Sequence, residues 1–74
     1  MNKTALLEEL KYIYQDKIID IEMAIDNLNR RIEENFDRPK VIDGIPSRIH
    51  ELQRDRNGLE RKIELLNDWI GELQ

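Results

Sequence analysis

Residues 45–73 read IPSRIHELQRDRNGLERKIELLNDWIGEL, and this stretch decides the fold. Its large aliphatic residues follow one another at intervals of four and three, with one interval of seven. They are Ile45, Ile49, Leu52, Leu59, Ile63, Leu66, Ile70 and Leu73. A heptad repeat with two apolar positions is typical of a helix that lies along another helix. We therefore predict one long helix over residues 47–73, with an apolar seam along one side.

A second apolar seam runs through the first half of the chain. Between Asn2 and Asn35 there is no Gly or Pro, and apolar residues recur at helical intervals. They are Leu7, Tyr14, Ile18, Ile21, Ile25, Leu28 and Ile32. This pattern predicts a helix over residues 3–36, capped by Asn2 or Thr4. At 1.5 Å per residue it would be roughly 50 Å long.

The residues that interrupt helices are concentrated between the two seams, and they predict a turn over residues 37–46. Pro39 disfavours helical backbone at the residue before it, Asp43 and Gly44 form a turn signal, and Pro46 suits a first helical turn. Asp43 or Ser47 is expected to cap the second helix. A connection of about ten residues returns the second helix antiparallel to the first.

The two seams also predict the register of the hairpin. If Ile32 lies opposite Ile49, the other seam residues meet in order. The expected pairs are Leu28 with Leu52, Ile25 with Arg56, Ile18 with Ile63, Tyr14 with Leu66, and Leu7 with Leu73. Seams of equal length that match in register predict an all-α, coiled-coil-like antiparallel hairpin. We expect residues 1–74 to form a single domain, since a chain this short supports only one.

Several large apolar residues fall outside the seams and gather near the two chain ends. They are Leu6, Leu10, Ile13 and Ile19 in the first predicted helix and Leu65 and Trp69 in the second. One interpretation is that they are ordinary exposed hydrophobic residues. We favour a self-association surface, because two seams alone bury little apolar area. The expected homo-oligomer is a dimer in which two hairpins form a four-helix bundle.

Composition and charge exclude some classes of protein. The net charge of −4 disfavours nucleic acid as a partner, because phosphate binding requires a local excess of Lys and Arg. Residues 30–62 hold nine basic and seven acidic residues, and the rest of the chain holds three and nine. An antiparallel dimer would place the basic turn of one copy beside the acidic ends of the other. No segment resembles a membrane span or signal peptide, and the lack of Cys fits a reducing compartment, so we expect a cytoplasmic protein.

Residues that could carry chemistry are sparse. His50 is the only histidine, and no second metal ligand lies three or four residues from it. The acidic pairs and series lack the Glu-x-x-His pattern of di-metal bundles, and no Gly-rich phosphate loop occurs. We therefore expect no catalytic residues, no metal site, no cofactor and no enzyme activity.

Two basic features remain as candidate binding residues. Arg56 occupies a seam position, where its guanidinium is expected to reach Glu22 or Asp26 and fix the register, or alternatively to bind an acidic partner. A second group converges on the turn and is a candidate contact for an acidic protein surface. It consists of Arg30, Arg31, Arg38, Lys40 and Arg48. A solvated turn with interleaved acidic residues is the alternative interpretation.

The functional class that fits this sequence is a small protein that works by contact. We expect a regulatory or protein-binding protein, such as a stoichiometric inhibitor or adaptor of bacterial or phage origin, with an unidentified protein partner. Eleven isoleucines among 74 residues are typical of a natural AT-rich coding sequence. The alternative is a structural subunit whose hairpins stack into larger helical oligomers.

Overall fold

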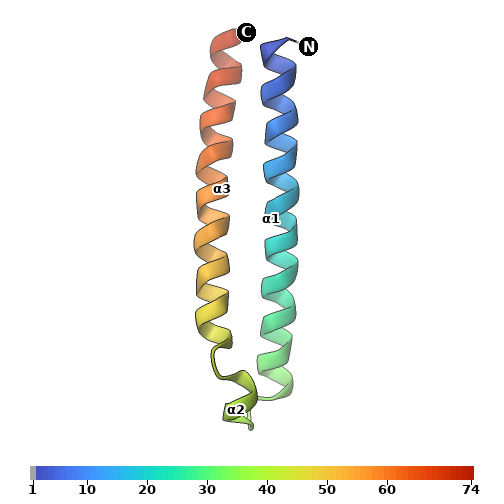
Figure 1. The fold of residues 1–74 in the computed structure, drawn as a ribbon, viewed down its shortest axis with the longest axis vertical. Helices are drawn as coiled ribbons and strands as arrows, with labels where there is room; N and C mark the ends of the chain where they lie inside the picture. Colours follow the sequence, from blue (N-terminus) through green and yellow to red (C-terminus); the bar gives the residue numbers. More distant parts are fainter. Residues whose placement is uncertain (1) are drawn as a thin grey trace.

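Two long antiparallel helices make up most of the computed structural model, which describes residues 2–74 (Figure 1). Helix α1 spans Lys3–Glu34 and helix α3 spans Ile45–Leu73, with the short helix α2, Pro39–Ile42, between them. The hairpin measures 55 × 16 × 13 Å. Both termini lie side by side at one end, here called the open end, and residues 35–44 form the turn end. The predicted all-helical hairpin is confirmed.

Asparagine side chains satisfy backbone groups at both ends of α1. The Oδ1 atom of Asn2 accepts a hydrogen bond from the backbone N–H of Ala5 at 2.7 Å, as expected for an N-cap. At the other end the side-chain amide of Asn35 donates to the carbonyl oxygen of Arg31 at 2.9 Å. The helix ends at Glu34, two residues before the predicted boundary, because Asn35 leaves the helical conformation.

The turn end differs from the predicted loop in two respects. Residues 39–42 form a single helical turn that begins at Pro39, and α3 begins at Ile45 instead of residue 47. The N-cap of α3 is Gly44, with φ of 80°, so the expectation of Asp43 or Ser47 as the cap is wrong. Pro46 lies in the first turn of α3, where its missing N–H costs no hydrogen bond, and the helix therefore starts before it.

The core follows the seam of α3. Ile45, Leu52, Leu66 and Ile70 are buried, whereas Leu73 at the end of the helix is 46% exposed. All seven predicted seam residues of α1 are only half-buried, and no residue of α1 is fully buried. In a hairpin of two helices, each seam residue is covered by the neighbouring helix on one side only. Part of the apolar surface of the seams therefore stays open to water.

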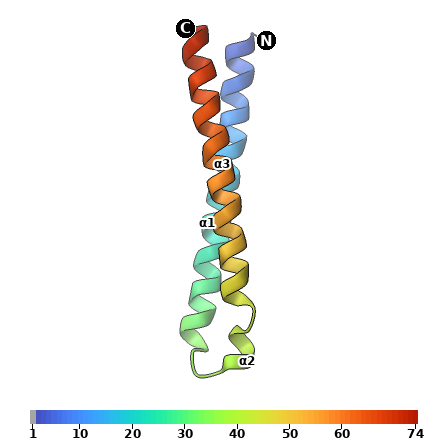
Figure 2. The same ribbon diagram turned by 90° about the vertical axis from the view of Figure 1, so that its left-hand side faces the viewer.

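The observed packing agrees with the predicted register. Tyr14 and Leu66 line the same surface groove, and Leu7 and Leu73 line another. Both are pairs that the seams predict. The helices cross each other at a shallow angle along the hairpin (Figure 2), which keeps the two seams in contact over their length.

Candidate functional site

Five apolar side chains form a continuous surface at the open end. On α1, Leu6, Leu10 and Ile13 are spaced four and three apart and line one groove with Glu9. Leu10 also lines a neighbouring groove together with Leu65 and Trp69 of α3. Because Leu10 belongs to both grooves, the five residues join across the two helices. We call this surface the open-end face.

The residues of the open-end face are large and substantially exposed. Their exposed fractions are 57% for Leu6, 36% for Leu10, 46% for Ile13, 51% for Leu65 and 48% for Trp69. The neighbouring seam residue Leu66 is only 3% exposed. Single exposed apolar residues are common, but a contiguous patch of this kind typically marks a contact surface. The sequence prediction named all five residues.

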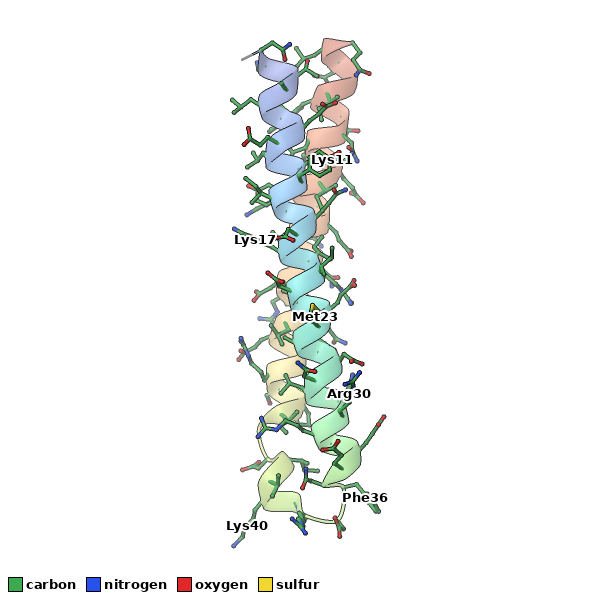
Figure 3. The ribbon with its side chains drawn as sticks, turned by 90° about the vertical axis from the view of Figure 1, so that its right-hand side faces the viewer. Lys11, Lys17, Met23, Arg30, Phe36 and Lys40 are labelled. Carbon is green, nitrogen blue, oxygen red and sulfur yellow. The ribbon has the colours of Figure 1, made fainter. Side chains whose placement is uncertain are left out.

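Ile19, the sixth residue of that prediction, does not join the face. It lies nine residues after Leu10, which is two and a half helical turns and therefore the opposite side of α1. There it shares a stripe with Tyr12 and Met23, at intervals of seven and four, and all three are more than half exposed. Met23 points away from α3 in Figure 3. We call Tyr12, Ile19 and Met23 the outer stripe.

Charged residues border the open-end face along the axis of the hairpin. Nearer the chain ends, Lys3 and Glu72 line a groove with Leu7, Trp69 and Leu73. On the other border, Lys17 and Lys62 place their Nζ atoms 5.9 and 5.5 Å from the centroid of the Tyr14 ring. These distances are typical of cation–π contacts. The inner border of the face therefore carries two lysine ammonium groups close to one aromatic ring.

The basic residues predicted at the turn end are exposed, and two of them already have acidic partners. Arg30 pairs with Asp26 at 3.0 Å and Arg48 with Glu51 at 3.2 Å. Within residues 2–74, no ion pair involves the remaining three, which are Arg31, Arg38 and Lys40.

Apolar side chains accompany these cations at the turn end. Phe36 is 76% exposed and Val41 is 43% exposed. In Figure 3, Phe36 and Lys40 project from opposite sides of the turn end. Sequence reasoning did not single out Phe36 as a contact residue, although an aromatic side chain beside a predicted turn was a visible signal.

Arg56 does not form the predicted ion pair between the helices. Its Nε atom lies 4.0 Å from a carboxylate oxygen of Glu60, one turn along α3, and its side chain is 30% exposed. Asp26, one of the expected partners, is bound to Arg30 instead. A partner four residues away on the same helix is within reach without an extended crossing, and this local pair is the one formed.

Lys11 is a second basic residue in the seams, and sequence reasoning missed it. It is half-buried and lies four residues after Leu7 and three before Tyr14. The interval of seven between those two apolar residues was the signal that could have revealed it. Each seam thus contains one basic residue, Lys11 on α1 and Arg56 on α3.

The described residues contain neither a group of side chains arranged for a metal ion nor a helix that could cross a membrane. His50 is exposed, and among the described residues no group of three His, Cys, Asp or Glu side chains is arranged to hold a metal ion. None of the described helices has a stretch that is both long enough and apolar enough to cross a bilayer. The expectation of no catalytic residues and no cofactor stays a prediction.

Comparisons with known proteins yield no relative of this chain. No family model, no curated protein and no solved structure matches it.

Proposed function

We propose that this chain is a small, non-enzymatic protein-binding regulator that dimerises through its open-end face. The observation that carries the proposal is the joining of Leu6, Leu10, Ile13, Leu65 and Trp69 into one exposed apolar surface across both helices. A second copy with the same surface can cover it, forming a four-helix bundle.

The incomplete core supports this assembly. No residue of α1 is fully buried in the hairpin, and Tyr14 and Leu66 of the seam line the same groove as Leu10 and Leu65. A second hairpin placed on the open-end face would therefore bury both the face and the adjoining edge of the seam. Burial of apolar surface contributes about 25 cal/mol per Å², so this contact would stabilise the fold as well as the dimer.

The turn end is the proposed contact for a different protein. Arg31, Arg38 and Lys40 are exposed and free of ion pairs within residues 2–74, and Phe36 exposes a large apolar side chain at the same end of the hairpin. A combination of cationic and aromatic side chains suits an acidic protein surface that carries an apolar pocket. In this arrangement the protein acts as an inhibitor or adaptor that masks or links its partner.

Sedimentation equilibrium tests the dimer directly. We expect the wild-type chain to be dimeric at micromolar concentration and Leu65→Glu to be monomeric, since the new charge lies within the open-end face. Met23→Glu introduces the same charge on the outer stripe and should leave the dimer intact. A wild-type chain that is folded and monomeric at micromolar concentration would contradict the proposal.

Charge reversal tests the turn end. In pull-downs from the native host, the variant carrying Arg38→Glu and Lys40→Glu should lose a partner that the wild-type chain retains. The matched control is Arg54→Glu with Arg61→Glu, which makes the same change in net charge on α3, away from the turn end and from the open-end face. Equal capture by all three chains would remove the turn end from the proposed function.

A structural assembly subunit is the second candidate function, and the outer stripe favours it. Tyr12, Ile19 and Met23 expose a second apolar surface on the side of α1 opposite Leu10, which would let hairpins continue to stack beyond a dimer. Light scattering over a concentration series separates the two candidates. A regulatory dimer keeps a fixed size, whereas an assembly subunit grows with concentration and stops at the dimer when Met23 is replaced by Glu.

A further inference from the structure

The charges that border the open-end face distinguish between the ways in which two copies could meet. The border nearer the chain ends holds Glu72 and Lys3, which line one groove with Trp69. The opposite border holds Lys17, Lys62 and Asp20, which line a groove on the other side of the face. The pattern along the face is therefore not symmetric from one border to the other.

A parallel dimer would bring like charges together. In that arrangement both open ends point the same way, so each border meets its own copy, and Lys17 and Lys62 face the same two lysines of the second hairpin. All four ammonium groups would lie around the two Tyr14 rings. Like charges opposed at the edge of an apolar contact oppose association.

An antiparallel dimer with full overlap would place charged residues against the apolar open-end face. The helical positions that continue the open-end face toward the turn end hold exposed charged residues, among them Arg31, Arg48, Glu51 and Asp55. Full overlap would press Leu6 and Trp69 of one copy against these charges of the other. Although the uneven charge along the chain favours this arrangement, covering charged groups with apolar side chains is costly.

We propose that two copies meet in opposite directions with only their open halves overlapping, so that each open-end face covers the other. This inference rests on the dimer proposed above and specifies its geometry. The two apolar faces then coincide. The border that holds Lys17, Lys62 and Asp20 in one copy meets the border that holds Lys3 and Glu72 in the other. Glu72 then approaches Lys17 and Lys62 of the second hairpin, and Lys3 approaches Asp20.

The functional consequence is a bivalent protein. The two turn ends, with Phe36, Arg38 and Lys40, lie at opposite ends of the dimer and point away from each other. Each hairpin is 55 Å long, and an overlap from Lys3 to Asp20 at a rise of 1.5 Å per residue covers about 26 Å, so the dimer is about 85 Å long. A parallel or fully overlapped dimer, by contrast, would be about as long as one hairpin. The separation of the turn ends in the half-overlapped dimer allows two partner molecules to bind without a clash between them.

Cysteine crosslinking tests this geometry, because the chain has no cysteine of its own. Lys3→Cys and Asp20→Cys are prepared separately, and neither residue takes part in the Tyr14 contacts. When equal amounts are mixed and treated with a short thiol crosslinker, a covalent dimer should form several-fold more efficiently than with either variant alone. Met23→Cys, on the outer stripe, is the control that should crosslink poorly.

The outcomes separate the geometry from the proposed function. Efficient crosslinking of Asp20→Cys with itself, together with a scattering length near 55 Å for a dimer, would overturn the half-overlapped geometry but leave the dimer standing. A monomer in sedimentation would overturn both.

A charge exchange supplies an independent check. Lys62→Glu should weaken dimerisation by about two- to fivefold, as expected for an exposed ion pair, and adding Glu72→Lys should restore it. Lys40→Glu, the same change at the turn end, should have no effect on dimerisation. Failure of Glu72→Lys to restore a dimer weakened by Lys62→Glu would count against this pairing and hence against the geometry.

Discussion

The ammonium group of Lys62 on α3 lies 5.5 Å from the centroid of the Tyr14 ring on α1. Lys17, one turn from Tyr14 on the same helix, approaches this ring to 5.9 Å. The half-buried ring thus receives one cation from each helix and packs in the seam at the same time. Because Lys62 and Tyr14 belong to different helices, this contact helps to fix the register of the hairpin. It also lies at the inner border of the open-end face.

Substitution of Tyr14 separates the role of the ring from the role of its hydroxyl. Tyr14→Phe keeps the ring and both cation contacts, and we expect the free energy of unfolding to change by less than about 0.5 kcal/mol. Tyr14→Leu keeps an apolar seam residue but removes the ring, and it should lower the free energy of unfolding by about 1 kcal/mol. Urea unfolding at one fixed protein concentration measures both. Equal stability of the two variants would show that the cations contribute nothing.

Replacement of Arg56 tests how a basic residue in the seam affects the stability of the hairpin. We expect Arg56→Leu to raise the free energy of unfolding by about 1 kcal/mol, because the aliphatic side chain fits the heptad position. The lost ion pair with Glu60 is local and exposed, worth only about 0.3–0.5 kcal/mol.

Partner capture by Arg56→Leu distinguishes the two interpretations of this residue. If Arg56 is a structural residue, the more stable variant binds the partner as well as wild type does. If it contacts the partner directly, capture is lost although stability increases. Glu60→Gln is the control, since it removes the ion pair and leaves the guanidinium in place.

Leu65 and Leu66 are adjacent in sequence and differ in what they should stabilise. Leu66 is 3% exposed, and Leu66→Ala should cost about 3 kcal/mol of unfolding free energy at any protein concentration. Leu65 is 51% exposed, so Leu65→Ala should matter only where the dimer is populated, because association stabilises the fold by mass action. Thermal unfolding at low and high concentration checks both. A concentration-independent loss for Leu65→Ala would place its role within the hairpin.

Most of the fold could be predicted because the heptad pattern encodes it twice. Two seams of equal length, separated by prolines and glycine, allow one antiparallel register, and the grooves shared by Tyr14 with Leu66 and Leu7 with Leu73 agree with it. Burial was harder to predict. A seam indicates which side of a helix faces its neighbour, but not that a two-helix layer leaves every residue of α1 partly exposed.

The sequence predictions were wrong where more than one local arrangement of the residues was possible. Near the turn, Asp43, Gly44 and Ser47 all have properties of a helix cap, and the need for a left-handed residue at the chain reversal selected Gly44. Around Arg56, acidic residues on both helices were possible partners, and the one four residues away formed the ion pair. Ile19 was grouped with Leu10 by proximity in sequence, although helical geometry separates them by half a turn.

Two glycines test this account of the turn with nearly identical substitutions. At both Gly44 and Gly58, an added Cβ would meet no atom within 4 Å, so steric contact with other residues plays no part. Gly44 has φ of 80°, and Gly44→Ala should lower the free energy of unfolding by about 1–2 kcal/mol, because a side chain disfavours left-handed backbone. Gly58 lies inside α3, and Gly58→Ala should raise the free energy by about 0.5–1 kcal/mol, because alanine is the better helix former. Opposite signs in urea unfolding are the expected result. Stabilisation by both substitutions would mean that residue 44 does not require the left-handed conformation on which the chain reversal depends.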